Sequence, residues 1–484
     1  MGEPTLSATR AGRTALFCGA LFLLCVGGFL LVRSFGETIV TPVGERASIG
    51  SGPSAGKGHL FAHVLLALAV VIIIGRLMGQ LFVWFGQPPV IGEVVAGIVL
   101  GPSLLGWFST DLFGINVTAF LFPADVKPFL GVIAQLGVVL YMFLVGLELN
   151  AGLLRSQAKA AVAISQASMM VPFLLGSGLA LGLYTSLAPP GVPFTSFALF
   201  MGIALAVTAF PVLARILTDR GIARTRLGTL ALGCAATGDA TAWCLLAFVV
   251  GVAQAHVGDA LRVLGLSVAF IALILLLARP IVAQLVSKIE GRPLSPGVLA
   301  VVFAALLLAA LATEAVGIHA LFGAFLLGAI VPHDSGLARQ LGQKLEGVVT
   351  VLFLPAFFAY TGLNTQIGLV SGAGAWLVCG LIVLVATLGK FGGTLVAARL
   401  TGLDWRTSAA LGVLMNTRGL MELIVLNVGL ELGVISQALF AMMVLMAIVT
   451  TMATAPVLAW LTPKEELLTS QPAERSRGPE AVQV

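Results

Sequence analysis

Asp239 lies in the middle of an apolar stretch, residues 227–255, that contains no other charged residue. An ionised carboxylate at membrane depth costs several kcal/mol, so it persists only beside water, a partner or a transported ion. Thr237, two positions earlier, adds a hydroxyl oxygen to the same stretch. The pattern predicts that Asp239 and Thr237 belong to a site that binds an ion or a proton.

A polar interruption, Thr208-Ala-Phe-Pro211, lies in the apolar stretch 194–217. Proline removes a backbone donor and disturbs the helical turn before it. The freed carbonyl groups are tolerated at membrane depth only where they face protein or a cavity. These carbonyls and the Thr208 hydroxyl are therefore candidate ion ligands. The alternative is a kinked helix whose role is packing alone.

The stretch 406–430 carries a similar interruption, Met415-Asn416-Thr-Arg418-Gly. Arg418 and Glu422 are four residues apart and share one helix face. They serve transport or, alternatively, form a neutral pair that only holds two helices together. Two interrupted, polar-centred helices in corresponding parts of two halves indicate a secondary transporter with inverted repeats and a midplane ion site.

Lys390 is the only lysine placed deep within an apolar stretch, 375–398, where its chain does not easily reach the membrane surface. A buried ammonium either pairs with a carboxylate or loses its proton. We expect Asp239 to be its partner, because a cation arriving at Asp239 would then displace both a proton and the lysine.

Other ionisable residues near apolar stretches are weaker candidates. Glu93, Glu148 and Glu314, the last with His319 nearby, are expected to be acids of interfaces or packing. His333 and Asp334 end a stretch on the expected cytoplasmic side, where a solvated loop is favoured over a pH sensor.

The composition restricts the chain to one broad class. Its 484 residues are 59% hydrophobic and 10% charged, and the mean hydropathy is +1.07, which excludes the soluble globular classes. The net charge of +5 comes from Lys and Arg in short loops, so it reports membrane orientation and does not indicate nucleic-acid binding. The five cysteines lie in apolar stretches without CxxC spacing, which indicates a structural role.

Fourteen apolar stretches are candidate membrane spans. They are residues 15–32, 59–78, 88–101, 128–147, 158–184, 194–217, 227–255, 260–286, 296–315, 318–332, 349–367, 375–398, 406–430 and 437–461. If the N-terminus is cytoplasmic, most of the 26 Lys and Arg residues fall in cytoplasmic loops, as the positive-inside rule requires. Both termini are therefore predicted to be cytoplasmic, and 194–217 and 406–430 cross in opposite directions.

Three regions follow from these boundaries: residues 1–58, 59–462 and 463–484. The first holds the span 15–32, for which a retained helix is favoured over a signal peptide, and an extracytoplasmic loop. Within that loop Gly52-Pro-Ser-Ala-Gly-Lys-Gly58 departs from a phosphate-binding loop in spacing and in its last residue, so we reject a nucleotide site. The middle region is the transport domain, and the last is a polar tail predicted to be disordered.

Several motifs occur in the order found in one transporter family. They are Gln87-Pro-Pro-Val-Ile-Gly-Glu93, Phe143-Leu-Val-Gly-Leu-Glu148, Val207-Thr208-Ala-Phe-Pro-Val-Leu-Ala-Arg215, Asp239-Ala-Thr-Ala-Trp243, Gly389-Lys390 and Met415-Asn-Thr-Arg418-Gly-Leu-Met-Glu422. From about residue 60 to 462 the sequence resembles the monovalent cation/proton antiporters, in the branch of bacterial Kef-type transporters and plant cation/proton exchangers.

The resemblance implies an all-α polytopic membrane protein with a sodium/proton antiporter-like fold, two inverted repeats and crossed discontinuous helices. It further implies a dimerisation domain and a core domain that moves against it like an elevator. In residue terms, Asp239 corresponds to the ion-binding aspartate, Thr208 to the ligand in the unwound helix and Lys390 to the core lysine. Arg418 and Glu422 correspond to the pair in the second broken helix.

One position departs from the family pattern. The residue before the key aspartate is commonly Asp, Asn or Gln, whereas this chain has Gly238. If Asp239 alone titrates, one proton exchanges for one cation and no net charge moves. A change in the protonation of Lys390 would alter that stoichiometry, so electroneutral exchange is a hypothesis.

The sequence thus predicts a secondary active antiporter that exchanges Na⁺ or K⁺ for protons. It is predicted to use no cofactor, to form a homodimer and to lie in the plasma membrane. The alternative is a cation channel or an efflux route gated by a separate soluble subunit. The apolar stretches contain no HExxH motif, no GxSxG motif and no paired catalytic aspartates, so the chain is predicted not to be an enzyme.

Overall fold

The computed structural model describes residues 5–37, 57–113, 116–148, 158–223, 225–254, 260–316 and 319–461, which are helical almost throughout. In this part of the chain, twelve helices are long and apolar enough to cross a membrane, or thirteen if the bent pair α19 (Trp405–Met415) and α20 (Leu420–Glu431) counts as one span. Each expected apolar stretch has a helical counterpart. However, α15 (Ala320–Ile330) has 11 residues, about 16 Å of helix, which is too short to cross alone.

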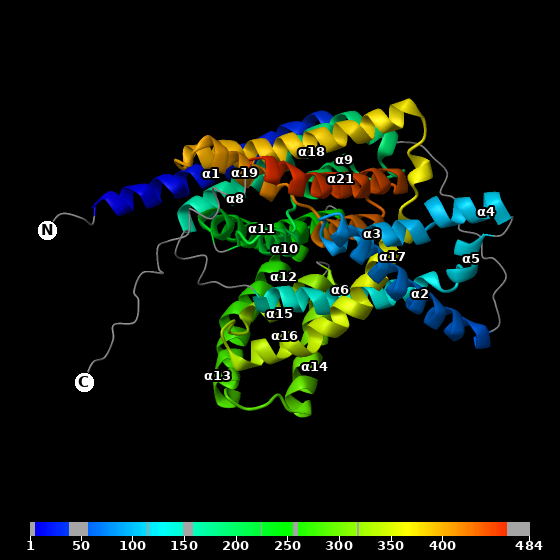
Figure 1. Ribbon diagram of the computed structural model, residues 1–484. Helices are drawn as coiled ribbons and strands as arrows, with labels where there is room; N and C mark the ends of the chain where they lie inside the picture. The colour runs from blue at the N-terminus through cyan, green and yellow to red at the C-terminus, as the bar shows by residue number, and fades with distance from the viewer. Residues whose placement is uncertain are drawn as a thin grey trace, which may run out of the picture.

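One group of helices, here called the core bundle, consists of the two interrupted helices and the helices packed around them (the upper layer in Figure 1). Its members are α1 (Thr5–Gly36), α8 (Ala158–Leu187), α9 (Phe194–Ala206), α10 (Phe210–Asp219), α11 (Arg226–Gln254), α18 (Gly372–Leu400), α19, α20 and α21 (Gln437–Leu461). Helices α9 and α20 are buried on nearly all sides, because an all-round apolar surface has to be covered by neighbours.

A second group of helices forms the scaffold bundle (below and to the right of the core bundle in Figure 1). They are α2 (Lys57–Trp84), α3 (Pro89–Leu100), α6 (Lys127–Glu148), α12 (Ala260–Leu273), α13 (Arg279–Ile289), α14 (Pro296–Val316), α15, α16 (Gly336–Val348) and α17 (Leu354–Asn364). Packing is extensive within each bundle and sparse between the two.

Glycine contacts hold the scaffold bundle together. A Cβ on Gly146 of α6 would lie 2.3 Å from the Phe325 carbonyl oxygen of α15, and one on Gly328 would lie 2.3 Å from the Phe143 carbonyl oxygen. The backbones of α6 and α15 therefore touch, as small residues permit in membrane helices.

Some regions expected to be loops are helical. The segment carrying Arg339 and Lys344 forms α16, which begins at the N-cap Ser335, whose side chain accepts a hydrogen bond from Ala338 N at 3.2 Å. Helix α16 runs without interruption into α17. The region after residue 101 contains the short helices α4 (Trp107–Phe113) and α5 (Val117–Leu121). The predicted extracytoplasmic loop, most of which is 38–56, and the predicted tail lie outside the described residues.

Candidate ion-binding site

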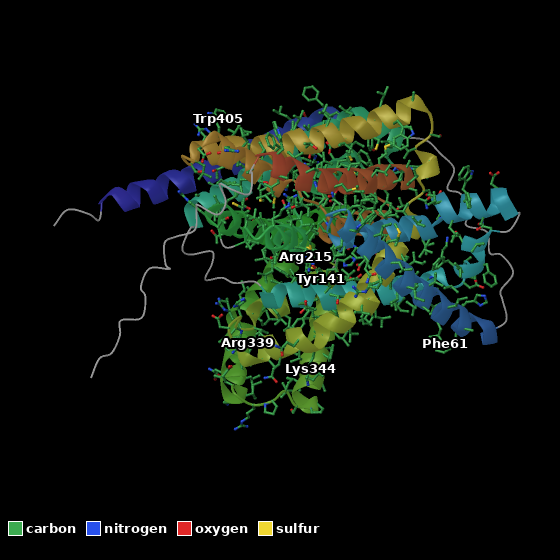
Figure 2. The ribbon with its side chains drawn as sticks, viewed as in Figure 1. Phe61, Tyr141, Arg215, Arg339, Lys344 and Trp405 are labelled. Atoms are coloured by element: carbon green, nitrogen blue, oxygen red, sulfur yellow. The ribbon has the colours of Figure 1, made fainter. Side chains whose placement is uncertain are left out.

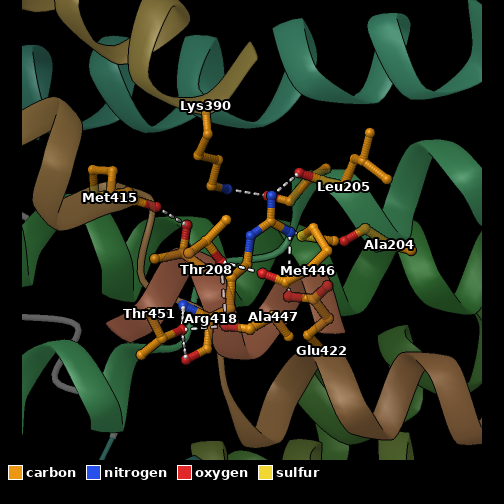
Figure 3. Close-up of polar contacts among 12 residues, drawn as sticks. Ala204, Leu205, Thr208, Lys390, Met415, Arg418, Glu422, Met446, Ala447 and Thr451 are labelled. Carbon is orange, nitrogen blue, oxygen red and sulfur yellow. Dashed lines mark hydrogen bonds and ion pairs between the residues drawn. The ribbon is translucent and has the colours of Figure 1, made fainter. Parts of the chain in front are cut away.

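Two broken helices cross at the centre of the core bundle. One break separates α9 from α10 at residues 207–209, and the other separates α19 from α20 at residues 416–419. Ala209 N donates to the Thr417 carbonyl oxygen at 3.1 Å. The Thr208 hydroxyl donates to the Met415 carbonyl oxygen at 3.2 Å (Figure 3). The backbone groups freed by each break are thus partly satisfied by the other break, as membrane burial requires.

Arg418 binds the carboxyl end of α9. Its Nη1 donates to the Ala204 carbonyl oxygen and its Nη2 to the Leu205 carbonyl oxygen, both at 2.8 Å, while Nη1 lies 3.3 Å from Glu422 Oε2. Both side chains are fully buried. The last carbonyls of a helix lack partners within the helix and carry partial negative charge, so a guanidinium stabilises them.

The sequence did not single out Thr451 of α21, which fixes the backbone of the second break. Its hydroxyl accepts from Arg418 N at 2.9 Å and lies 2.9 Å from the Arg418 carbonyl oxygen. This threonine holds the extended turn that aims the Arg418 side chain at α9. The only sequence signal was a polar pair, Thr450-Thr451, within an apolar stretch.

Lys390 also binds the carboxyl end of α9. Its ammonium, which is buried, donates to the Ala206 carbonyl oxygen (Figure 3). The expected direct pair with Asp239 is absent: no ion pair within 4.0 Å joins these two described residues, although their charges are close enough to interact through space. The expectation was wrong about the contact because the carbonyl at the end of α9 is the nearer acceptor.

Asp239 lies on α11, which packs against α9, α10 and α19. The residue is 4% exposed, and Oδ1 has no hydrogen-bond partner among the described residues. Asn416 in the second break is also buried, and its Oδ1 lacks a partner in the same part of the chain. Thr237 donates its hydroxyl to the Gly233 carbonyl oxygen at 2.8 Å, which leaves its oxygen lone pairs as acceptors. The core therefore contains buried oxygen atoms without donors, as a cation site requires.

The weaker candidates lie apart from the crossing. Glu93 of α3 lies 3.7 Å from Arg76 of α2, and Glu314 accepts from Ala320 N at 2.8 Å. His333 Nδ1 lies 3.0 Å from Asp334 Oδ1 at the exposed start of α16, and the side chain of Glu148 is outside the described residues. No group of three His, Cys, Asp or Glu side chains able to hold a metal ion occurs in the described segments.

Two cavities lie where the core and scaffold bundles meet. A cavity of about 380 Å³ is lined by Pro211, Val212 and Arg215 of α10, by Leu420 of α20 and by scaffold residues that include Tyr141. Figure 2 shows Tyr141 and Arg215 at this boundary. Through Pro211 and Leu420, this cavity reaches the first turn after each helix break. Asp239 is absent from the described lining of this cavity.

The second cavity, of about 350 Å³, lies toward the other end of α20. Beside it two hydrogen bonds join the bundles: Asn427 Nδ2 donates to the Thr361 hydroxyl at 2.8 Å, and Gln135 Nε2 donates to Glu431 Oε2 at 3.1 Å. A further bond joins the bundles near the first cavity, where Gln87 Nε2 donates to the Met452 carbonyl oxygen at 3.3 Å.

The fold and the site together define an ion-coupled membrane transporter with two crossed discontinuous helices. The chain belongs to the sodium/hydrogen exchanger family: the model of its transmembrane domain matches residues 64–462. This membership confirms the family predicted from the motifs.

Two relatives and one solved structure give the range of similarity. The chain is 45% identical over 406 residues to the Na⁺/H⁺ antiporter NhaS4 of Synechocystis, covering 83% of this chain and 98% of that one. It is 39% identical to cation/H⁺ antiporter 17 of Arabidopsis thaliana over 84% of this chain, but spans 50% of the plant protein. The structure of a sodium/proton antiporter from Methanocaldococcus jannaschii, 15% identical, superposes with a TM-score of 0.60 over 85% of this chain and 99% of that one. The predicted fold is thereby confirmed.

Proposed function

We propose that this multi-pass membrane protein is a secondary active antiporter that exchanges Na⁺ or K⁺ for protons, and that Asp239 binds the two in turn. The observation that carries the proposal is the buried Asp239 carboxylate, which has an oxygen without a donor among the described residues. A carboxylate in this position requires a proton or a cation to neutralise it. The relatives from Synechocystis and Arabidopsis thaliana, both named as antiporters, support the exchange activity.

Competition at Asp239 couples the two ions. A proton neutralises the carboxylate directly, whereas a Na⁺ or K⁺ ion needs further oxygen ligands to replace its water. Thr208, Thr237 and Asn416 carry hydroxyl or amide oxygens on the helices that meet at the crossing. Lys390 stays bonded to Ala206 and attracts the empty carboxylate through space. Only the occupied site crosses, because an empty charged site is costly to move through the membrane.

Movement of the core bundle against the scaffold bundle exposes Asp239 to each side in turn. The sparse packing between the bundles favours such a rigid-body motion. Cavities lie between the bundles at both ends of α20, one beside the bonds from Asn427 and Gln135 and the other beside Pro211. We place this cavity on the cytoplasmic side, because the loops expected there are the basic ones.

Exchange in proteoliposomes tests the proposal. Imposed pH gradients should collapse on addition of Na⁺ or K⁺, with rates that saturate with cation concentration. One titrating carboxylate predicts electroneutral exchange, so an imposed membrane potential of 100 mV, worth about 2.3 kcal/mol for each charge moved, should leave the rate within about twofold. A rate that follows the potential contradicts electroneutrality, and conductance without a counter-ion supports the channel instead.

Assembly and location complete the proposal. We place the protein in the plasma membrane with both termini cytoplasmic, and we propose a homodimer joined through the scaffold bundle while the core bundles move. Light scattering of the detergent-solubilised protein should give twice the mass of the 49.9 kDa chain. A monomer mass across all detergents tested contradicts the dimer.

A further inference from the structure

Ser165 of α8 lies directly against the helix that carries Asp239. A Cβ added to Gly238 would lie 3.2 Å from the Ser165 hydroxyl oxygen, the only heavy atom of the described residues within 4 Å outside the local backbone. The two helices are fixed in register near this point, because Gln166 Nε2 donates to the Thr241 hydroxyl at 2.9 Å. The missing side chain at position 238 thus leaves room for a hydroxyl beside the Asp239 backbone.

The Ser165 hydroxyl is buried without a partner. The side chain is 1% exposed, and its oxygen has no hydrogen bond within the part of the chain that the structure describes. A serine in a helix ordinarily bonds a carbonyl of the preceding turn, as Thr237 does on the neighbouring helix. A buried hydroxyl that forgoes this bond is destabilised unless another group satisfies it.

Ser165 contacts Gly238, the residue that precedes Asp239 on α11, and the Ser165 and Asp239 oxygens are both unpaired among the described residues. A serine oxygen has two lone pairs, and protein oxygens replace the water around a monovalent cation when it binds within a membrane. Ser168, one turn further along α8, is also unpaired, but it is not among the close neighbours of Gly238.

We propose that the Ser165 hydroxyl is an oxygen ligand of the transported cation beside Asp239 and contributes to selection among Li⁺, Na⁺ and K⁺. This assignment rests on the proposed exchange at Asp239. It places one ligand on α8, outside the two broken helices and α11.

The test compares four proteins in proteoliposomes and measures the half-saturating concentration and maximal rate for each cation. Ser165→Ala should raise the half-saturating concentration of the best-bound cation about tenfold, the effect expected for one lost ligand, with unequal changes among the three ions and a nearly unchanged maximal rate. Ser177→Ala is the matched control, because Ser177 is a buried serine of α8 whose hydroxyl already donates to the Ala198 carbonyl oxygen at 3.2 Å. It should leave all three concentrations within about twofold.

A rescue separates a ligand from a packing residue. Removal of the Ser165 oxygen makes space at position 238, so the double variant Ser165→Ala/Gly238→Ser should recover part of the lost affinity. Unchanged half-saturating concentrations in Ser165→Ala, or equal changes for all three ions, overturn the inference while the wild type still exchanges. Absence of exchange in the wild type overturns the proposed function itself.

Discussion

Asp239→Asn is expected to reduce cation-dependent proton movement in proteoliposomes to the background of empty liposomes. The amide keeps the shape of the carboxylate but carries no charge, so it neither takes up a proton in the physiological range nor neutralises a cation. Because Asp239 is buried, removal of its charge also removes a desolvation cost. The variant should therefore insert, purify and melt at a temperature equal to or above that of the wild type.

Binding provides a second measurement that does not depend on transport. A ligand at 100 times its dissociation constant stabilises the folded state by about 2.7 kcal/mol, so Na⁺ or K⁺ should raise the melting temperature of the wild type. The same cations should leave the melting temperature of Asp239→Asn unchanged. Loss of exchange with retained stabilisation by cations would place the binding site elsewhere and contradict the assignment.

Asp404→Asn is the matched control for this substitution. Asp404 is the exposed N-cap of α19, and hydrogen bonds from Thr407 lower the pKa of its carboxyl. Asparagine caps helices about as well as aspartate, so exchange and stabilisation by cations should both persist. Loss of exchange in this control as well would indicate that any Asp→Asn change in the core bundle disturbs the protein.

The sequence located the breaks and the buried acid because each violates a local rule. Pro211 cannot continue the hydrogen bonding of a helix, and Asp239 is too costly to occur by chance in an apolar stretch. Both signals are contained in a few neighbouring residues. The positions of the breaks and the burial of Asp239 were therefore predictable, while the family followed from the ordered motifs and implied the crossing.

Contacts made to backbone atoms were not predictable. Lys390 binds the Ala206 carbonyl oxygen, a group that every residue type possesses and that becomes an acceptor only because α9 ends there. Ser165 gave no signal because serine is common in membrane helices and because Gly238, which it contacts in space, is distant in the sequence. The short length of α15 was hidden because apolar residues continue beyond its ends.

Arg418→Met is expected to destabilise the folded protein by about 3–5 kcal/mol, the cost of breaking a buried ion pair. The substitution leaves Glu422 fully buried without its cation, and it removes the two donors that Arg418 supplies to the carbonyls of Ala204 and Leu205. We expect a large loss of monodisperse protein after solubilisation and a clearly lower melting temperature. Exchange per correctly folded molecule is the quantity to compare with the wild type.

Arg220→Met is the matched control for the loss of an arginine that binds a backbone carbonyl. Arg220 donates to the Ala455 carbonyl oxygen at 2.6 Å, but it is half-buried and forms no ion pair with an acid whose side chain the structure describes. Water can reach the groups that the substitution exposes, so the cost should be within about 1 kcal/mol. The difference between the two variants measures the effect of burial and of the orphaned Glu422.

The double variant Arg418→Met/Glu422→Leu distinguishes the two roles considered for the pair. If the pair only balances its own charges and binds the last carbonyls of α9, removal of both charges should recover much of the stability lost in the single variant. The reason is that replacing a buried ion pair by apolar side chains often changes the free energy of unfolding little. Recovery should be incomplete, since the carbonyls of Ala204 and Leu205 still lack their donors. A stable double variant that binds cations through Asp239 but does not exchange them would instead assign the pair to the transport movement. In that case α9 and α20 fold without the Arg418–Glu422 pair but do not move as one unit.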